Sequence, residues 1–357
     1  MQRIVLERKQ VDASLLEPAL DALAAGELVV VPTETLYLLA GDAKRTSRLL
    51  AAEARIRQTC GVTPARVWLG TPEMTAPALA GWPLPAQRLA QRYWPGPLQV
   101  RLPKVSALPE MMVPGEPVTR ALLECHGGAL LALALPVAPP VTDAVRAKRA
   151  LRELAGEEVR PRVLLDSGPS AYGCAPARVE VAAFAVRVTS FGPLDVRRLR
   201  EAARVHVAFV CTGNICRSPL AAAMLRALAQ RDAEATFSGE YEPVLKTSSC
   251  GIAALSGSPA PPEAHTAAEP HGAEVYLREH RAKQANAQEL ATADIILVAA
   301  REHRSALLRL APELEPRIHP LEPNGKDVRD PYMESPRVYE QVAQTIRRGL
   351  AQRFFGG

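Results

Sequence analysis

The segment from Cys211 to Ser218, CTGNICRS, places a cysteine six positions before an arginine. A cysteine thiolate is a strong nucleophile, and a guanidinium fork can hold two oxygens of a phosphoryl group. Gly213 and Asn214 tolerate left-handed backbone conformations, which turn successive N–H groups inward towards an anion. We therefore predict that a phosphate group binds here. The residues expected to surround it are Thr212, Gly213, Asn214, Ile215, Cys216 and Ser218.

The chemistry expected at this loop is attack of Cys211 on phosphorus. Helix N-termini and nearby cations lower a cysteine pKa from about 8.5 into the range of about 3.5–7.5, so we expect a thiolate at neutral pH. Arg217 would grip the phosphoryl oxygens. The Ser218 hydroxyl would hydrogen-bond first to the thiolate and later to the departing phosphate.

The same spacing occurs at Cys60 and Arg66, so the spacing alone is weak support. The flanking elements distinguish the two matches. An apolar run at 205–210 predicts a strand before Cys211, and 218–229 predicts a helix after it, so this loop would lie at a helix N-terminus, where anions bind. The earlier match has no such strand and contains Pro64. We interpret the earlier match as accidental.

Expulsion of an alkoxide or phenoxide requires a proton donor. Asp330-Pro331 is the only Asp-Pro pair in the chain and precedes the last expected helix. We predict that Asp330 handles this proton, and that Tyr332 forms an aromatic wall beside a ring substrate. The alternative is a turn aspartate that caps the following segment.

The elements that would position these residues alternate between strand and helix. Strands at 246–250 and 294–299 and helices at 301–310 and 335–352 continue the pattern begun at 205–210, which predicts a parallel sheet covered on both faces.

The first 200 residues alternate in the same way. Expected helices lie at 12–25, 45–57, 86–93, 117–124 and 141–155, and expected strands at 27–32, 66–69, 97–102, 128–134, 161–166 and 179–189. The fold class is therefore α/β, with two domains at 1–200 and 204–357 that join near 192–204.

The bulk composition is that of a folded globular protein. Of 357 residues, 48% are hydrophobic and 23% are charged, with a formal net charge of +5. The basic residues are spread along the chain, which favours a mixed surface over a nucleic-acid-binding one. We expect no signal peptide and no membrane span, because no apolar run reaches about 18 residues. The widely spaced cysteines indicate reduced thiols and a cytoplasmic location.

Residues 205–357 resemble low-molecular-weight protein tyrosine phosphatases. The matching segments are VCTGNICRSPLA at 210–221, SSCG at 248–251, EHRAKQ at 279–284, ADIILVAAREH at 293–303 and DPYMESPRVYEQ at 330–341. The resemblance implies a four-stranded parallel sheet flanked by helices. It also implies hydrolysis of phosphotyrosine-type monoesters, on a phosphorylated protein or a small molecule, without a metal or cofactor.

The resemblance further implies the role of each matching residue. Cys211 would be the nucleophile of a cysteinyl-phosphate intermediate, and Arg217 would be the phosphate clamp. Asp330 would be first the acid and then the base for the hydrolytic water. Asn214 and Ser249 would hold the shape of the loop.

Two residues bear on alternatives within this family. Cys216 either forms a reversible disulfide with Cys211 that shields it from over-oxidation, or fills space as a small apolar side chain. Arginine phosphatases of this fold carry threonine where Ile215 stands, so phosphotyrosine-type substrates are favoured. Arsenate reductases of this fold need two further closely spaced cysteines, and only Cys250 lies downstream.

Residues 10–195 resemble the YrdC-like threonylcarbamoyl-AMP synthase family, through VPTETLY at 31–37 and YWPGPL at 93–98. The resemblance implies a twisted α/β fold with a nucleotide cleft, with ATP and double-stranded RNA or tRNA as possible partners. Candidate cleft residues are Thr33, Thr35, Tyr37, Arg55 and Arg57. The first three could equally be structural, as a strand end, a turn hydroxyl and a half-buried ring.

Several departures from this second family affect the polar ligands of the nucleotide. Leu38 stands where the family has glycine, and Arg55-Ile56-Arg57 stands where it has Lys-x-Arg. Arginine does not reproduce the compact charge of lysine in a tight phosphate site. LALP at 133–136 and Ala177-Arg178 replace two further polar segments. We therefore expect a degenerate module that keeps the fold and has lost or weakened the synthase chemistry.

Three functions are compatible with these patterns. The leading one is a phosphatase with an appended degenerate module. The second is a bifunctional enzyme that also makes threonylcarbamoyl-AMP for tRNA modification, and the third is a non-catalytic phosphate-binding adaptor.

Overall fold

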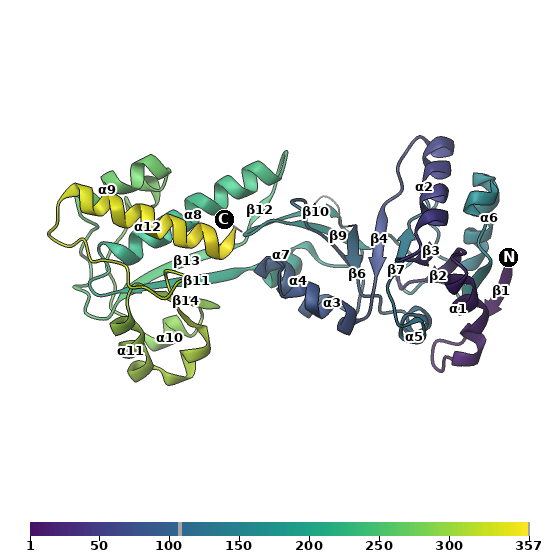
Figure 1. Ribbon diagram of the computed structural model, residues 1–357, viewed down its shortest axis with the longest axis horizontal. Helices are drawn as coiled ribbons and strands as arrows, with labels where there is room; N and C mark the ends of the chain where they lie inside the picture. Colours follow the sequence, from purple (N-terminus) through teal and green to yellow (C-terminus); the bar gives the residue numbers. More distant parts are fainter. Residues whose placement is uncertain (106–108, 356–357) are drawn as a thin grey trace. The chain divides into compact units, whose positions relative to one another are not determined.

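The computed structural model describes residues 1–105 and 109–355, so the last two residues of the second predicted domain lie outside the described part. The chain forms two compact units (Figure 1). The first unit comprises Met1–Trp82, Ala86–Val181 and Val186–Ala202; the second comprises Pro83–Pro85, Ala182–Ala185 and the chain from Ala203 onward. Within the described ranges, every helix is too short or too polar to cross a bilayer.

The first unit is built on a mixed sheet. Its strands are β1 (Gln2–Val5), β2 (Val29–Pro32), β3 (Tyr37–Asp42), β4 (Arg66–Leu69), β5 (Leu98–Arg101), β6 (Glu110–Met112), β7 (Leu130–Leu133), β8 (Val163–Asp166), β9 (Ala177–Val181) and β10 (Ala185–Ser190). They follow the order β1-β8-β2-β3-β7-β4-β6-β5-β9-β10. The β2 strand is antiparallel to β3 and parallel to β8, and all of its residues are buried, as its continuous apolar sequence requires.

Helices cover both faces of this sheet. They are α1 (Glu17–Ala24), α2 (Ser47–Cys60), α3 (Pro72–Leu79), α4 (Leu84–Tyr93), α5 (Pro117–His126), α6 (Ala144–Leu154) and α7 (Val196–Ala203). One apolar core joins α1 and α5 to the sheet, and a second joins α2 and α6 to the opposite face. The α6 helix begins where the Asp143 carboxylate accepts a hydrogen bond from Arg146 N, a common helix cap.

Two expected elements differ from the observed ones. The single strand expected at 179–189 is instead a hairpin in which β9 and β10 pair antiparallel through a tight connection at Ala182–Phe184. The helix expected at 12–25 begins as a short 3₁₀ turn at Ala13–Leu16, because Pro18 can enter only the first turn of the α-helix that follows.

The second unit contains the predicted four-stranded parallel sheet. Its strands are β11 (Val205–Cys211), β13 (Leu245–Gly251), β14 (Ile295–Val298) and β15 (Ile318–Pro320), in the order β13-β11-β14-β15. The β11 strand pairs in parallel with both β13 and β14, so it is central and all seven of its residues are buried. A short β12 (Glu242–Pro243) precedes β13.

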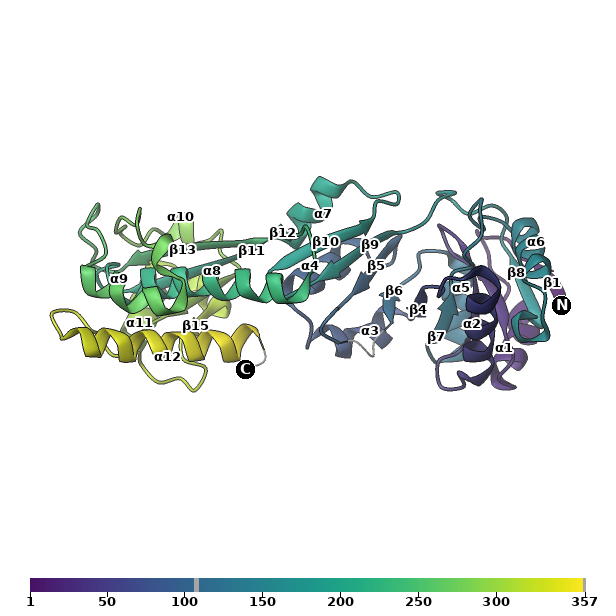
Figure 2. The same ribbon diagram turned by 90° about the horizontal axis from the view of Figure 1, so that it is seen from above.

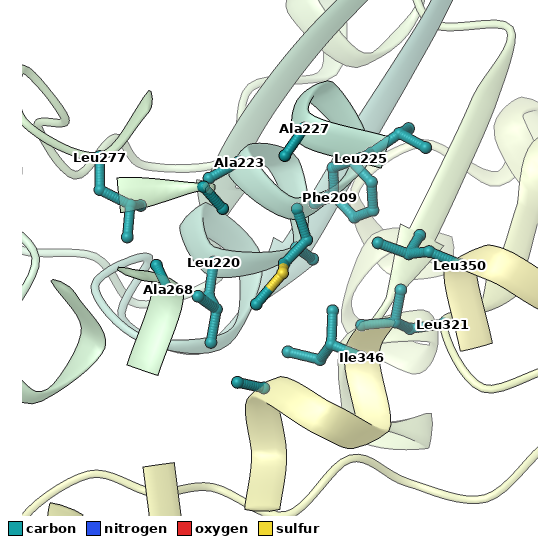
Figure 3. Packing of buried hydrophobic residues seen from close by; sticks show 14 of the residues in the cluster. Phe209, Leu220, Ala223, Leu225, Ala227, Ala268, Leu277, Leu321, Ile346 and Leu350 are labelled. Carbon is teal, nitrogen blue, oxygen red and sulfur yellow. The ribbon is translucent and has the colours of Figure 1, made fainter. Parts of the chain in front are cut away.

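Helices flank this sheet on both faces, so the predicted fold class is confirmed. They are α8 (Arg217–Thr236), α9 (Pro262–Ala268), α10 (Ala287–Leu290), α11 (Arg301–Leu310) and α12 (Pro336–Phe354). Side chains alternate along β11. Phe209 and Cys211 face the core formed with α8, α9 and α12, whereas Ala208 and Val210 face α10 and α11. Figures 1 and 2 show α8 and α12 running side by side, and Figure 3 shows Phe209, Leu220 and Ile346 meeting in their core.

Candidate active site

The CTGNICRS segment connects the central strand to the longest helix of the second unit. β11 ends at Cys211 and α8 begins at Arg217, so the loop between them lies at a helix N-terminus, where unpaired N–H groups attract an anion. Asn214 has a φ of 54°, in the left-handed region. A side chain at Gly251, at the end of the neighbouring strand, would clash with the carbonyl oxygen of Thr212, so only glycine allows this close approach.

Asn214 holds the loop through both ends of its side chain. It is fully buried, and its Nδ2 donates to Ser218 Oγ at 2.8 Å and to Ser249 Oγ at 2.9 Å. Its Oδ1 accepts from Lys283 N at 2.8 Å, and its carbonyl oxygen accepts from His280 Nε2 at 2.7 Å. These bonds stabilise the left-handed backbone, since they fix the residue from four sides.

The sulfur of Cys211 lies 3.0 Å from Ser218 Oγ. Ser218 Oγ accepts from Asn214 Nδ2, so its single proton can be donated either to the Cys211 sulfur or to Cys250 O, which lies 3.3 Å away. The Cys211 side chain is only 2% exposed, so it lies at the floor of the loop and access to it is narrow. The Ser218 hydroxyl is thus within hydrogen-bond distance of the sulfur.

Arg217 lies beneath the same loop and is 4% exposed. Its NH1 donates to Val328 O at 3.3 Å, and its NH2 donates to Thr212 Oγ1 at 3.1 Å. The NH2 group also forms a short ion pair with Asp330 Oδ2. Its Nε is buried and has no partner among the described residues, so this donor is available to an oxyanion.

Asp330 therefore lies within the loop cluster, although it is more than a hundred residues away in sequence. Its side chain is 46% exposed, and its Oδ1 accepts from Tyr332 N at 3.2 Å. The Tyr332 side chain is also exposed, at 58%, and next to it Met333 is 87% exposed with a φ of 60°. The carboxylate and the aromatic ring thus stand on one exposed turn beside the phosphate loop.

The remaining loop residues have distinct environments. Cys216 is buried, its Sγ lies 3.2 Å from Tyr339 OH, and burial raises the pKa of its thiol to about 11. It is a thiol at neutral pH that fills core space, and its predicted disulfide with Cys211 stays a prediction. Ile215 is half-buried and packs against the same core. All six cysteines are free thiols.

Two histidines beside the loop were not singled out from the sequence, although both lie in segments that carry the family resemblance. His280 holds Asn214, as described above. His303 is fully buried on α11, and its Nε2 lies 3.0 Å from Thr212 Oγ1. Burial and, next, the Arg217 charge lower the pKa of His303 and favour its neutral form.

The accidental cysteine–arginine match in the first unit has no comparable geometry. Cys60 ends α2, and Arg66 begins β4 with its Nε 3.0 Å from Glu53 Oε1. The arginine is therefore engaged with a carboxylate, and the segment between the two leads from a helix C-terminus into a strand, so it does not lie at a helix N-terminus.

The candidate cleft residues of the first unit mostly bond within the fold. Thr33 and Thr35 are each 1% exposed, their hydroxyls lie 3.1 Å apart, and Thr33 also donates to Leu36 O at 2.7 Å. The Tyr37 ring is fully rather than half buried, and its hydroxyl donates to Gly168 O at 2.6 Å.

The two arginines proposed for the cleft lie on α2. Arg55 donates from both Nε and NH2 to Ala155 O, at 2.8 and 2.6 Å, and so satisfies the end of α6. Arg57 is exposed. Leu38 is buried in the sheet.

Comparison with known proteins identifies the second unit. Residues 206–354 match the family described as low molecular weight phosphotyrosine protein phosphatase. A relative from Ralstonia nicotianae, "Probable low molecular weight protein-tyrosine-phosphatase EpsP", is 34% identical over 142 residues, which cover 40% of this chain and 88% of the relative. The chain belongs to the low-molecular-weight protein-tyrosine-phosphatase family. The phosphatase Wzb of Salmonella typhi is 30% identical over 40% of this chain and 87% of its own length.

The first unit of this low-molecular-weight phosphatase is similar to a different family. Residues 21–180 match the Sua5/YciO/YrdC family described as telomere recombination. A Mycobacterium tuberculosis protein provisionally named threonylcarbamoyl-AMP synthase is 29% identical over 204 residues, which cover 53% of this chain and 89% of that protein. The phosphatase thus carries a divergent YrdC-like module at its N-terminus, as the sequence predicted.

Proposed function

We propose that the second unit hydrolyses phosphotyrosine-type monoesters through a cysteinyl-phosphate intermediate, with Cys211, Arg217 and Asp330 as its catalytic residues. The observation that carries the proposal is the Cys211 sulfur, 3.0 Å from the Ser218 hydroxyl at the start of a helix, within a loop that also holds the Arg217 guanidinium. Its relatives carry names of tyrosine phosphatases, which supports the same chemistry.

In the first step, the Cys211 thiolate attacks phosphorus and the bond from phosphorus to the leaving oxygen breaks. Arg217 and the loop N–H groups stabilise the charge on the phosphoryl oxygens. Asp330 gives its proton to the leaving oxygen. In the second step, Asp330 takes a proton from water, the water oxygen attacks phosphorus, and the thiolate departs with a hydrogen bond from Ser218.

These two reaction steps require the Asp330 side chain to move away from the Arg217 guanidinium. In the free enzyme the Asp330 carboxylate is paired with Arg217 NH2. A bound phosphoryl group supplies competing oxygens to the guanidinium and so frees the Asp330 carboxylate. The freed carboxylate takes up a proton from solvent and turns to the leaving group as the carboxylic acid. The half-exposed turn that carries Asp330 and Tyr332 allows such a movement at low cost.

The proposed substrates are a phosphorylated protein or a small aryl phosphate. Ile215 supplies an apolar side chain beside the phosphate loop, and Tyr332 supplies an exposed ring. We expect the enzyme to hydrolyse a phosphotyrosine peptide at least about tenfold faster, in kcat/KM, than a phosphoarginine peptide of the same sequence, because an apolar contact favours the aryl group. Phosphate release from the two peptides measures this ratio. Equal rates, or a preference for phosphoarginine, would contradict the substrate assignment.

We further propose that the first unit, residues 1–200, is a domain that keeps the YrdC-like fold without its synthase chemistry, beside a phosphatase domain at 204–357 in a cytoplasmic protein. Thr33, Thr35 and Tyr37 direct their hydroxyls to neighbours in the fold, and Arg55 serves a helix end. ATP or RNA binding at this unit is the alternative. We expect no pyrophosphate release above background with threonine, bicarbonate and ATP. Robust release would make the protein bifunctional.

A further inference from the structure

The hydroxyl of Thr212 joins two side chains from different elements. Arg217 NH2 donates to Thr212 Oγ1 at 3.1 Å, and His303 Nε2 lies 3.0 Å from the same oxygen. A hydroxyl has one proton and two lone pairs, so it can accept from the guanidinium while it either donates to the imidazole or accepts from it. The result is a hydrogen-bonded chain from Arg217 through Thr212 to His303.

His303 is well suited to anchor this chain. It is fully buried on α11, so the ring has a fixed position in the core. Burial is the main cause that lowers the pKa of His303, and the Arg217 charge acts in the same direction. The carboxylates of Glu302, Asp330 and Asp327 oppose this effect, and Glu302 Oε1 lies 3.4 Å from Nε2. A neutral ring carries one proton, on Nδ1 or on Nε2, and in either form Nε2 can hydrogen-bond to the Thr212 hydroxyl.

The hydrogen bonds that link Arg217, Thr212 and His303 matter because Arg217 loses one partner during the proposed reaction. In the free enzyme the guanidinium contacts Val328 O, Thr212 Oγ1 and the Asp330 carboxylate. Once Asp330 turns to the leaving group, the carbonyl and the hydroxyl are the contacts that remain. Both are neutral, so they orient the guanidinium without offsetting the charge that the phosphoryl oxygens need.

We propose that Thr212 and His303 are positioning residues that hold the Arg217 guanidinium in its phosphate-binding orientation. The inference rests on the proposed phosphatase function and deepens it. The two side chains act through Arg217 and touch no reacting atom.

Replacing Thr212 tests this hydrogen-bonded chain with almost no change in the shape of the side chain. Thr212→Val removes the hydroxyl and keeps the branched side chain, whereas Thr212→Ser keeps the hydroxyl. We expect Thr212→Val to weaken binding of inorganic phosphate to the full-length protein about tenfold, because one hydrogen bond to a charged group is lost. We expect the KM for p-nitrophenyl phosphate to rise in parallel, and Thr212→Ser to stay within about twofold of wild type. Calorimetry measures the first quantity and steady-state kinetics the second.

A matched control and a double variant separate positioning from folding. Thr266→Val removes an exposed hydroxyl that bonds only Pro262 O on α9, and should change neither quantity. His303→Leu keeps the buried volume but removes the imidazole. If His303 acts through Thr212, the double variant with Thr212→Val and His303→Leu should bind phosphate no worse than Thr212→Val alone. Additive losses, or a Thr212→Val protein that binds phosphate like wild type, would overturn the inference.

The behaviour of the wild type distinguishes the positioning role of Thr212 from the phosphatase function itself. An active wild type with an unaffected Thr212→Val variant overturns the positioning role alone. A folded wild type that neither binds phosphate nor hydrolyses p-nitrophenyl phosphate overturns the phosphatase function, and with it this inference.

Discussion

Replacement of Cys211 by serine should abolish turnover of p-nitrophenyl phosphate, with a loss in kcat of about 10⁴-fold or more. A serine hydroxyl is not ionised at neutral pH, so the variant lacks the anionic nucleophile, whereas the loop that binds phosphate is unchanged. Asn214, Ser249 and Lys283 hold this loop without any contribution from the sulfur. We therefore expect Cys211→Ser to bind inorganic phosphate within a few-fold of wild type, as measured by calorimetry.

The chain supplies a matched control for this variant. Cys60 has the same six-residue spacing to an arginine, yet Arg66 is bound to Glu53 and the segment lies at no helix N-terminus. Cys60→Ser should retain full activity. A comparable loss in both variants would show that thiol replacement harms the protein generally, and residual turnover in Cys211→Ser would indicate another nucleophile.

Replacement of Asp330 by asparagine should have an effect that depends on the leaving group. Hydrolysis of phenyl phosphate should slow by about 10²–10⁴-fold, because phenoxide leaves poorly without a proton. Hydrolysis of 2,4-dinitrophenyl phosphate should slow by less than about tenfold, since its leaving group is stable as an anion. Because Asp330 competes for Arg217 in the free enzyme, the KM for either substrate should not rise.

A neighbouring aspartate controls for a general loss of charge on this segment. Asp327 accepts hydrogen bonds from the backbone and side-chain nitrogens of Arg301, at 2.9 and 3.3 Å, and among the described residues it has no hydrogen bond to the phosphate loop. Asp327→Asn should slow the hydrolysis of both substrates only slightly and by the same factor. If Asp330→Asn also slows both substrates equally, its role is positional and the acid lies elsewhere.

The strand–loop–helix geometry around residues 211–217 could be predicted from the sequence because its determinants are local. A buried strand, a glycine, an asparagine that tolerates positive φ and a helix start follow each other within about twenty residues. The fold class was predictable for the same reason, since strands and helices alternate along the chain and each has its own local pattern of apolar residues. The short buried strand β3 was not predicted, because its apolar residues follow the PTET segment without a pattern that separates strand from loop.

The family resemblance indicated the contact of Asn214 with Ser249, but two other contacts between distant segments could not be predicted. No spacing rule places Asp330 on the guanidinium of Arg217 or brings His303 to Thr212, because these contacts depend on how α11 and the 330 turn pack beside β11. The hairpin at β9 and β10 was also missed, since its two strands are separated only by small and apolar residues. The burial of Tyr37 reflects packing between sheet and helices, which local sequence does not reveal.

The most direct test is to trap the intermediate. The full-length enzyme is mixed with p-nitrophenyl phosphate, quenched in acid within its first turnover, digested and sequenced by mass spectrometry. We expect one phosphoryl group on sulfur in the peptide that contains Cys211, and none in Cys211→Ser. Turnover of the substrate with no phosphoryl group on residue 211, or with the group on another residue, would contradict the assignment of Cys211 as nucleophile.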